Sequence, residues 1–172
     1  ALGNLGDNHS SERLIELLKD DTTSVRRAAA TALGQLKATS AVSALFELLQ
    51  PDAELFVQHA GTRALMEIGE IALTKTYLAR TDSPHHQIIA LRVLDQAEPE
   101  ALQASEVMPL LKSPHGDVRS EAQRVIANRH DWQEPVLHVF KSLLHTASIT
   151  TDIAQQIDGI TTAFGNEKGF LD

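Results

Sequence analysis

The amino-acid sequence predicts an all-α protein, namely a right-handed α-α superhelix, or solenoid, of about five helix pairs. Three observations lead to this prediction. The apolar residues are of the kind that closely packed helices use, they recur with helical spacing, and the whole pattern returns about every thirty residues.

The composition favours helices over sheets. Hydrophobic residues make up 42% of the 172 residues and aromatic residues only 4%, and the apolar set consists mostly of Ala, Leu, Ile and Val. A β-sandwich would use more aromatic and β-branched residues. The chain contains no cysteine, which excludes disulfides, a thiol nucleophile and a thiolate metal site.

One amphipathic pattern occurs four times. In the segment 25–36, apolar residues follow the i, i+3, i+4, i+7 spacing of a single helix face. The face that starts at Val25 returns at Val57, His86 and Val118, so that successive copies are 32, 29 and 32 residues apart. Such self-similarity is the signature of a repeat protein, in which each unit buries its apolar stripe against the next one.

A second amphipathic stretch precedes each of these helices, and turn formers and N-caps separate the two. The expected helix pairs span residues 10–37, 40–69, 70–97, 102–130 and 132–164, with a tail at 165–172. Residues 1–7 align with the end of a second helix, so we expect them to close a preceding repeat of a longer chain. Apolar faces left uncovered at the two ends would favour end-to-end self-association.

Two phrases resemble a known family. LLKDDTTSVRRAAATALGQL, residues 17–36, is similar to the HEAT repeats of phycobilisome lyases, and LLKSPHGDVRSEAQRVIA repeats the match at 110–127. Gln58 and Gln87 stand where the arginine of the Val-Arg motif is expected. The resemblance implies stacked helix pairs whose second helices line one face, usually the concave one, and it implies protein binding.

The charge balance limits the kinds of partner. Fifteen basic residues against twenty-three acidic ones give a net charge of −8, which disfavours nucleic acid. HEAT-like DNA glycosylases need a basic groove with aromatic residues, which this composition does not supply. No apolar run approaches the length of a membrane span, so we predict no membrane partner, and cytoplasm and periplasm both remain open as compartments.

Candidate binding residues lie in two columns of the second helices. One column holds Arg63, Arg92 and Arg124, and the neighbouring column contributes Arg27 and His59. A row of guanidiniums about 10 Å apart would bind an acidic peptide, a carboxylate or a phosphate. The alternative is a solvated face whose arginines are neutralised by acids on the same helix, such as Glu67 and Asp95.

Two further arginines, Arg26 and Arg119 of the Val-Arg motifs, are interpreted as structural. We expect them to pair with acids in the turns, such as Asp21 and Asp117. Trp132, the only tryptophan, is interpreted as a packing wedge.

Catalytic signals are missing from the sequence. His85 and His86 are adjacent, and neighbouring residues on a helix point about 100° apart, so they are not expected to share a metal. The sequence has no HExxH motif, none of the His-Glu pairs of the di-iron HEAT-repeat hydroxylases, no phosphate-binding glycine loop and no GxSxG. We therefore predict neither a metal nor a cofactor.

The leading hypothesis is a non-catalytic scaffold that binds a protein segment along its second helices. The alternative is the docking region of a larger enzyme of the lyase, oxidoreductase or multi-haem cytochrome type, with the chemistry elsewhere. A purely structural spacer is the third hypothesis.

Overall fold

A computed structural model describes residues 2–144, 151, 153–154, 157–158 and 161. Over these residues the chain forms helices joined by turns, without a strand, which confirms the all-α prediction. The chain divides into two compact units, residues 1–101 and 102–172. The sequence had been interpreted as one continuous segment.

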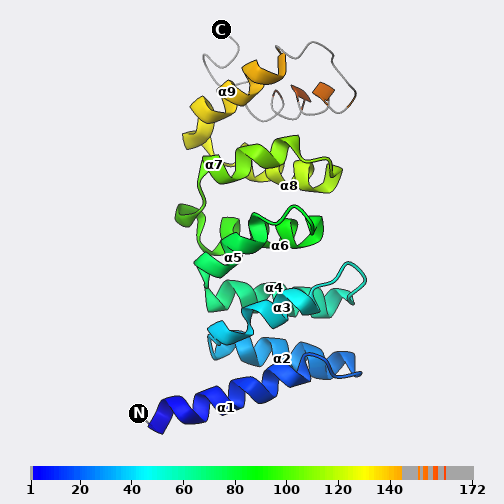
Figure 1. The fold of residues 1–172 in the computed structure, drawn as a ribbon, viewed down its shortest axis with the longest axis vertical. Coiled ribbons are helices and arrows are strands. Elements are labelled where there is room, and N and C mark those ends of the chain that lie inside the picture. Colours follow the sequence, from blue (N-terminus) through cyan, green and yellow to red (C-terminus); the bar gives the residue numbers. More distant parts are fainter. Residues whose placement is uncertain (1, 145–150, 152, 155–156, 159–160, 162–172) are drawn as a thin grey trace. The chain divides into compact units, whose positions relative to one another are not determined.

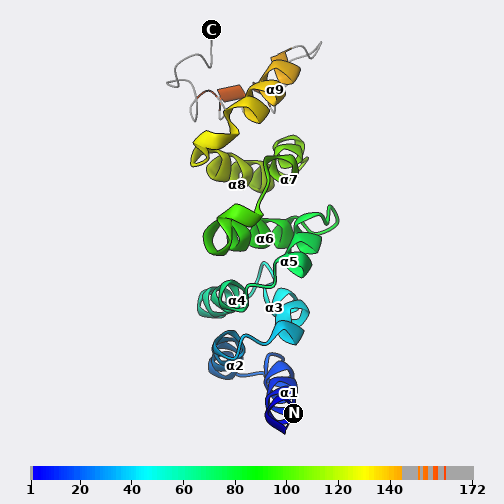
Figure 2. The same ribbon diagram turned by 90° about the vertical axis from the view of Figure 1, so that its left-hand side faces the viewer.

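The first unit is built from three helix pairs (Figure 1). Its α-helices are α1 (Leu2–Leu17), α2 (Thr23–Gln35), α3 (Val42–Leu48), α4 (Leu55–Ile68), α5 (Ile71–Leu78) and α6 (Pro84–Ala97). Two 3-10 turns accompany them, η1 (Thr39–Ala41) and η2 (Pro99–Ala101). Figure 2 shows that α2, α4 and α6 form one layer of this unit and α1, α3 and α5 the other.

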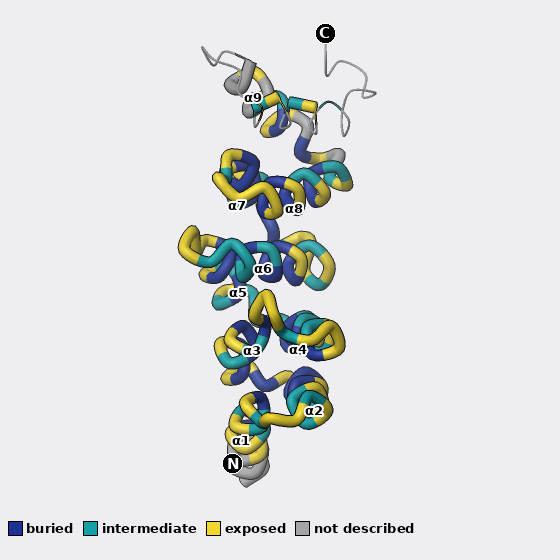
Figure 3. The backbone as a smooth tube through the Cα atoms, turned by 90° about the vertical axis from the view of Figure 1, so that its right-hand side faces the viewer, coloured by how far each residue is buried: buried dark blue, intermediate teal, exposed yellow. Residues whose placement is uncertain are grey.

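The core of the first unit lies between these layers, where the tube of Figure 3 is dark blue. Its largest fully buried side chains include Leu33, Leu65 and Phe46. The ring of Phe46 in α3 stacks on that of Tyr77 in α5, with centroids 3.7 Å apart and planes 9° from parallel. This contact joins the first helices of neighbouring pairs, so each pair contributes to the core of the next, as the repeat pattern predicts.

Small residues allow α2 and α4 to pack closely. A Cβ atom added to Gly34 would lie 2.8 Å from the Cα atom of Ala64, well inside normal contact distance. The carboxylate of Glu67 also approaches this position, with one oxygen 2.7 Å from the added atom. The alanine-rich composition of the second helices therefore has a direct packing role.

The first helix differs from the expected boundary. α1 runs without a break from Leu2 to Leu17, whereas the sequence suggested a helix end within residues 1–7 and a new start at residue 10. Gly3 and Gly6 lie inside the helix; a glycine there costs only about 1 kcal/mol and does not remove a hydrogen bond as proline does.

The second unit begins with a helix pair whose first member is short. This first member consists of α7 (Ala104–Val107) and η3 (Met108–Lys112), and it packs on the second member, α8 (Gly116–Ala127). The expected helix at 106–112 is largely a 3-10 helix, and Pro109 lies in its first turn, where its missing N–H is not needed but where it interrupts the hydrogen bonds that would continue α7.

The next elements are η4 (His130–Trp132) and α9 (Gln133–Leu144). Most of the second helix expected at 149–164, and the whole tail at 165–172, lie outside the described residues.

Candidate functional site

One column of the second helices binds the turn that precedes each helix. Nη1 of Arg26 donates to the carbonyl oxygen of Asp20 at 2.7 Å, and Nη1 of Arg119 donates to that of Ser113, also at 2.7 Å. These carbonyl groups lie just past the end of the first helix of each pair, where no helical N–H reaches them. The two arginines therefore stabilise the turn through its main chain.

The two glutamines in the same column have the same role. Nε2 of Gln58 donates to the carbonyl oxygen of Ala53 at 2.7 Å, and Nε2 of Gln87 donates to that of Leu78 at 3.1 Å. The departure of these repeats from the Val-Arg motif thus replaces a charged donor with a neutral one. The interpretation of Arg26 and Arg119 as structural is confirmed. Within the turn, however, Arg26 donates to the main-chain oxygens of Asp20 and Asp21 and not to the carboxylate of Asp21.

Arg26 also joins two repeats through Glu54, the residue before α4. Its Nη2 atom lies 2.9 Å from both carboxylate oxygens of Glu54, and the hydroxyl group of Thr23 donates to the same carboxylate at 2.6 Å. The bond from Thr23 is the main reason why the pKa of Glu54 is lowered to about 2, and Arg26 lowers it further. The start of α4 is thereby fixed against α2.

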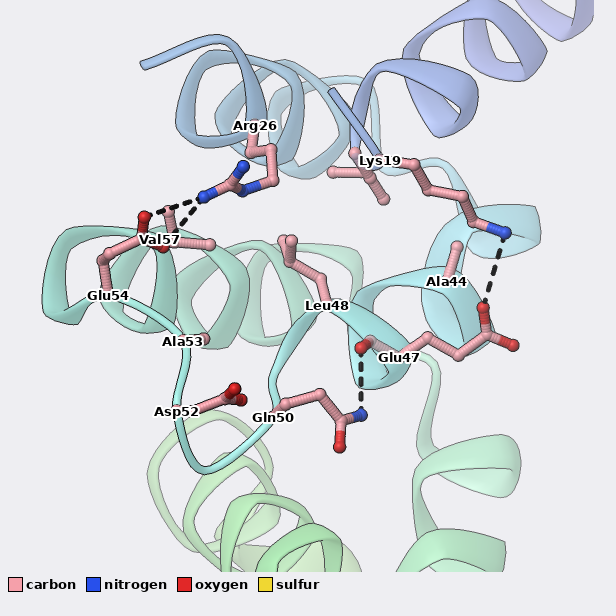
Figure 4. A pocket seen from close by; sticks show the side chains of 11 residues that line it. Lys19, Arg26, Ala44, Glu47, Leu48, Gln50, Asp52, Ala53, Glu54 and Val57 are labelled. Atoms are coloured by element: carbon pink, nitrogen blue, oxygen red, sulfur yellow. Dashed lines mark hydrogen bonds and ion pairs between the residues drawn. The ribbon is translucent and has the colours of Figure 1, made fainter. Parts of the chain in front are cut away.

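A surface pocket of about 430 Å³ lies beside this contact (Figure 4). Its apolar lining comes from Leu18, Leu48 and Val57, together with two alanines. The two cations at its rim are both paired, Lys19 with Glu47 at 3.8 Å and Arg26 with Glu54 at 2.9 Å. The exposed pair of Lys19 opens readily, but an anionic ligand would have to displace Glu54 from Arg26, whose side chain is only 19% exposed, so the pocket offers an acidic partner one accessible cation.

The predicted binding residues of the first unit lie exposed on its second helices. Arg27 is on α2, His59 and Arg63 are on α4, and Arg92 is on α6. Nε of Arg63 lies 2.8 Å from Glu67, the partner that the alternative interpretation expected. A pair this exposed contributes little energy and opens readily when another carboxylate approaches. We call Arg27, His59, Arg63 and Arg92 the second-helix surface.

Arg124, the remaining candidate, is on α8 in the second unit. Its Nη2 atom lies 2.9 Å from Glu121, whose side chain is buried. Arg124 belongs to the second unit and is not part of the second-helix surface.

Charge is segregated within the first unit. Its second helices, α2, α4 and α6, carry two acidic residues, Glu67 and Asp95, and four arginines, of which Arg26 is paired with Glu54 and the other three are exposed. The chain as a whole has a net charge of −8. The second helices are therefore a locally basic layer in an acidic molecule.

Sequence reasoning missed one exposed aromatic residue. Phe56 in the first turn of α4 is 67% exposed, the most exposed of the large hydrophobic residues in the part of the chain with described side chains. It immediately precedes Val57, with which the apolar stripe begins, so the 100° step of a helix already placed it off that stripe. His59 and Arg63 follow it at i+3 and i+7 and share its face of α4.

The paired histidines lie in a partly buried place. The ring of His85 bonds to the main chain of Leu49 and that of His86 to the main chain of Phe46, while Nε2 of His85 and Nδ1 of His86 are buried without a hydrogen-bond partner. Burial is the main cause that lowers both pKa values. The residues that the structure describes include no group of three or more side chains suited to hold a metal ion.

Trp132 is buried, and the guanidinium carbon of Arg129 lies 4.2 Å from the centre of its ring. The interpretation of Trp132 as a packing wedge is thus confirmed. Across the described helices, none combines the length and the hydropathy needed to span a membrane.

Stacked helix pairs with a shared core and a turn-binding column define the class of this protein as an α-α solenoid. Comparison with protein families agrees, because the model of the HEAT repeats matches residues 11–80. This match supports a HEAT-repeat protein, and it covers the last part of α1, the helices α2 to α4 and all of α5. Comparison with curated proteins gave no match. The phycobilisome-lyase subtype remains a prediction.

Proposed function

We propose that this chain is a non-catalytic scaffold that binds an acidic segment of another protein along the second-helix surface. The observation that carries the proposal is the charge of the exposed second helices, where Arg27, Arg63 and Arg92 face two acids, Glu67 and Asp95, in a chain of net charge −8. HEAT repeats are generally protein-interaction scaffolds, and residues 11–80 match them.

The geometry favours a peptide over a small anion. Neighbouring helices lie roughly 10 Å apart, so the surface from α2 to α6 extends over about 20 Å. An extended peptide covers that distance with about six residues. A single carboxylate or phosphate group would contact only one of the arginines, and the second-helix surface lies outside the pocket described above.

The test measures binding of a fluorescein-labelled peptide of about ten residues, made of Asp, Glu, Ser and Gly, to the full chain by fluorescence anisotropy. The variant carries Arg63→Glu and Arg92→Glu. Arg13→Glu and Arg80→Glu form the matched control, because these arginines are also exposed, and each is paired with a neighbouring carboxylate at 2.8 and 3.0 Å. The control removes the same charge at residues outside the second helices, in α1 and in the turn after α5.

We expect Arg63→Glu with Arg92→Glu to weaken binding by about tenfold or more and the control pair to weaken it only slightly. Binding should also decrease steeply with added salt. Equal losses in the two double variants would show that only the total charge matters, and absence of binding to the native chain would reject the proposal.

The larger-enzyme hypothesis assigns the same surface to docking, with chemistry supplied outside this chain. No contact in the described residues favours it over a free-standing scaffold. The two hypotheses share the binding test, and both treat this segment as non-catalytic.

A further inference from the structure

Phe56 is unusual because it is both exposed and rigidly held. Its side chain is 67% exposed, yet the main chain on both sides of it is fixed. Glu54 is held by Thr23 and Arg26, and Gln58 donates to the carbonyl oxygen of Ala53 at 2.7 Å. Exposing a large apolar side chain on an ordered helix gives no folding advantage, since that side chain remains in water.

The position of Phe56 relates it to the second-helix surface. On α4 it shares a face with His59 and Arg63, and seven helical residues correspond to roughly 10 Å along the axis. In the repeat alignment, Arg27 of α2 is equivalent to His59. Phe56 is therefore an apolar position at the edge of a basic surface, on the side where α4 begins.

Resting on the proposed function, we infer that the partner is an acidic peptide that also carries a large apolar side chain, which packs on Phe56 while a carboxylate about 10 Å away binds Arg63. In an extended peptide this distance corresponds to about three residues. Aromatic side chains commonly act as anchors of this kind, and nearby charges set orientation and specificity.

The second exposed apolar residue in this turn, Leu55, points about 100° away from Phe56 and extends the apolar area sideways. It is 61% exposed. Leu36, at the end of α2, is also exposed but lies at the opposite end of the second helices, and it therefore serves as a matched control.

The experiment compares two labelled peptides on the full chain by anisotropy. The acidic probe is the peptide described above. The acidic leucine probe is identical except that one Ser, three residues from an Asp-Glu pair, is replaced by Leu. We expect the leucine probe to bind the native chain about tenfold more tightly, as burial of one apolar side chain allows.

The variants locate this gain. Phe56→Ser should abolish the preference for the leucine probe, whereas Leu36→Ser should leave it unchanged. Both variants should retain the native unfolding midpoint within error, because the replaced side chains are exposed. A preference that survives in Phe56→Ser would overturn the inference.

Two further outcomes are decisive. If the two probes bind equally and both depend on Arg63 and Arg92, the proposed function holds and the role of Phe56 is wrong. If neither probe binds, both fail. Because a base can also stack on an aromatic ring, an oligothymidine is tested alongside. Tighter, Phe56-dependent binding of the oligothymidine would replace the peptide with single-stranded nucleic acid and overturn the inference.

Discussion

Replacing Gln87 by Met removes one hydrogen bond from the junction of α5 and α6 and leaves the shape of the side chain nearly unchanged. Nε2 of Gln87 lies 3.1 Å from the carbonyl oxygen of Leu78, the last residue of α5. A carbonyl at a helix end has no donor within its own helix. Gln87 is only 4% exposed, so water is poorly placed to replace the amide.

The size of the effect follows from that burial. A buried acceptor left without a donor costs about 1–3 kcal/mol, and we expect Gln87→Met to lower the free energy of unfolding by about 2 kcal/mol. Gln58→Met is the matched control. It removes the equivalent bond to Ala53, which is shorter at 2.7 Å, but both residues are partly exposed. Because water can hydrate that carbonyl group, we expect a loss of about 0.5–1 kcal/mol.

Urea unfolding followed by far-UV circular dichroism measures both losses, with the slope of each transition checked for constancy. We expect loss of the longer bond to cost more, because burial rather than bond length sets the cost. Equal losses in the two variants, or an unchanged Gln87→Met, would refute it.

Three other predictions concern the described contacts. The pKa of Glu54 is lowered from 4.5 to about 2, mainly by the bond from Thr23. The contribution of Glu54 to stability is therefore complete above pH 4.5 and is lost as the pH falls through about 2. The pH-stability curves of the native chain and Glu54→Gln should converge in acid, and parallel curves would contradict this. Burial lowers the pKa values of His85 and His86 below 6.5, with Arg92 near the first and Arg80 and Asp82 near the second. The stability of the native chain should therefore decrease as the pH falls below 6.5. Thermal unfolding should show a smaller decrease with pH when the two histidines are replaced by Asn. In Gly34→Ala the added carbon would lie 2.7 Å from a carboxylate oxygen of Glu67, which can move aside, and 2.8 Å from the Cα atom of Ala64, which cannot move without its helix. The overpacking cost of about 1–3 kcal/mol should therefore exceed the gain in helix propensity of about 1 kcal/mol. Urea unfolding measures the difference, and a more stable variant would show that α2 and α4 separate freely.

The sequence by itself determined the helices and their repetition. The apolar stripe that begins at Val25 and returns at Val57 and His86 can be recognised without any structure, because a helix face is set by spacing along the chain. The same angular logic placed Arg27, Arg63 and Arg92 off the stripe, and all three are exposed. These properties are local, so local patterns suffice to predict them.

Only the tertiary structure decided which groups meet. Arg26 binds Glu54 of the next repeat, and Gln87 donates to Leu78 where other repeats use an arginine. Both contacts depend on which turn each helix packs against. The exposure of Phe56 depends equally on what its neighbours leave uncovered. Hydrogen-bond partners and solvent exposure are set by contacts between segments far apart in the sequence, which a pattern with a period of a few residues does not encode.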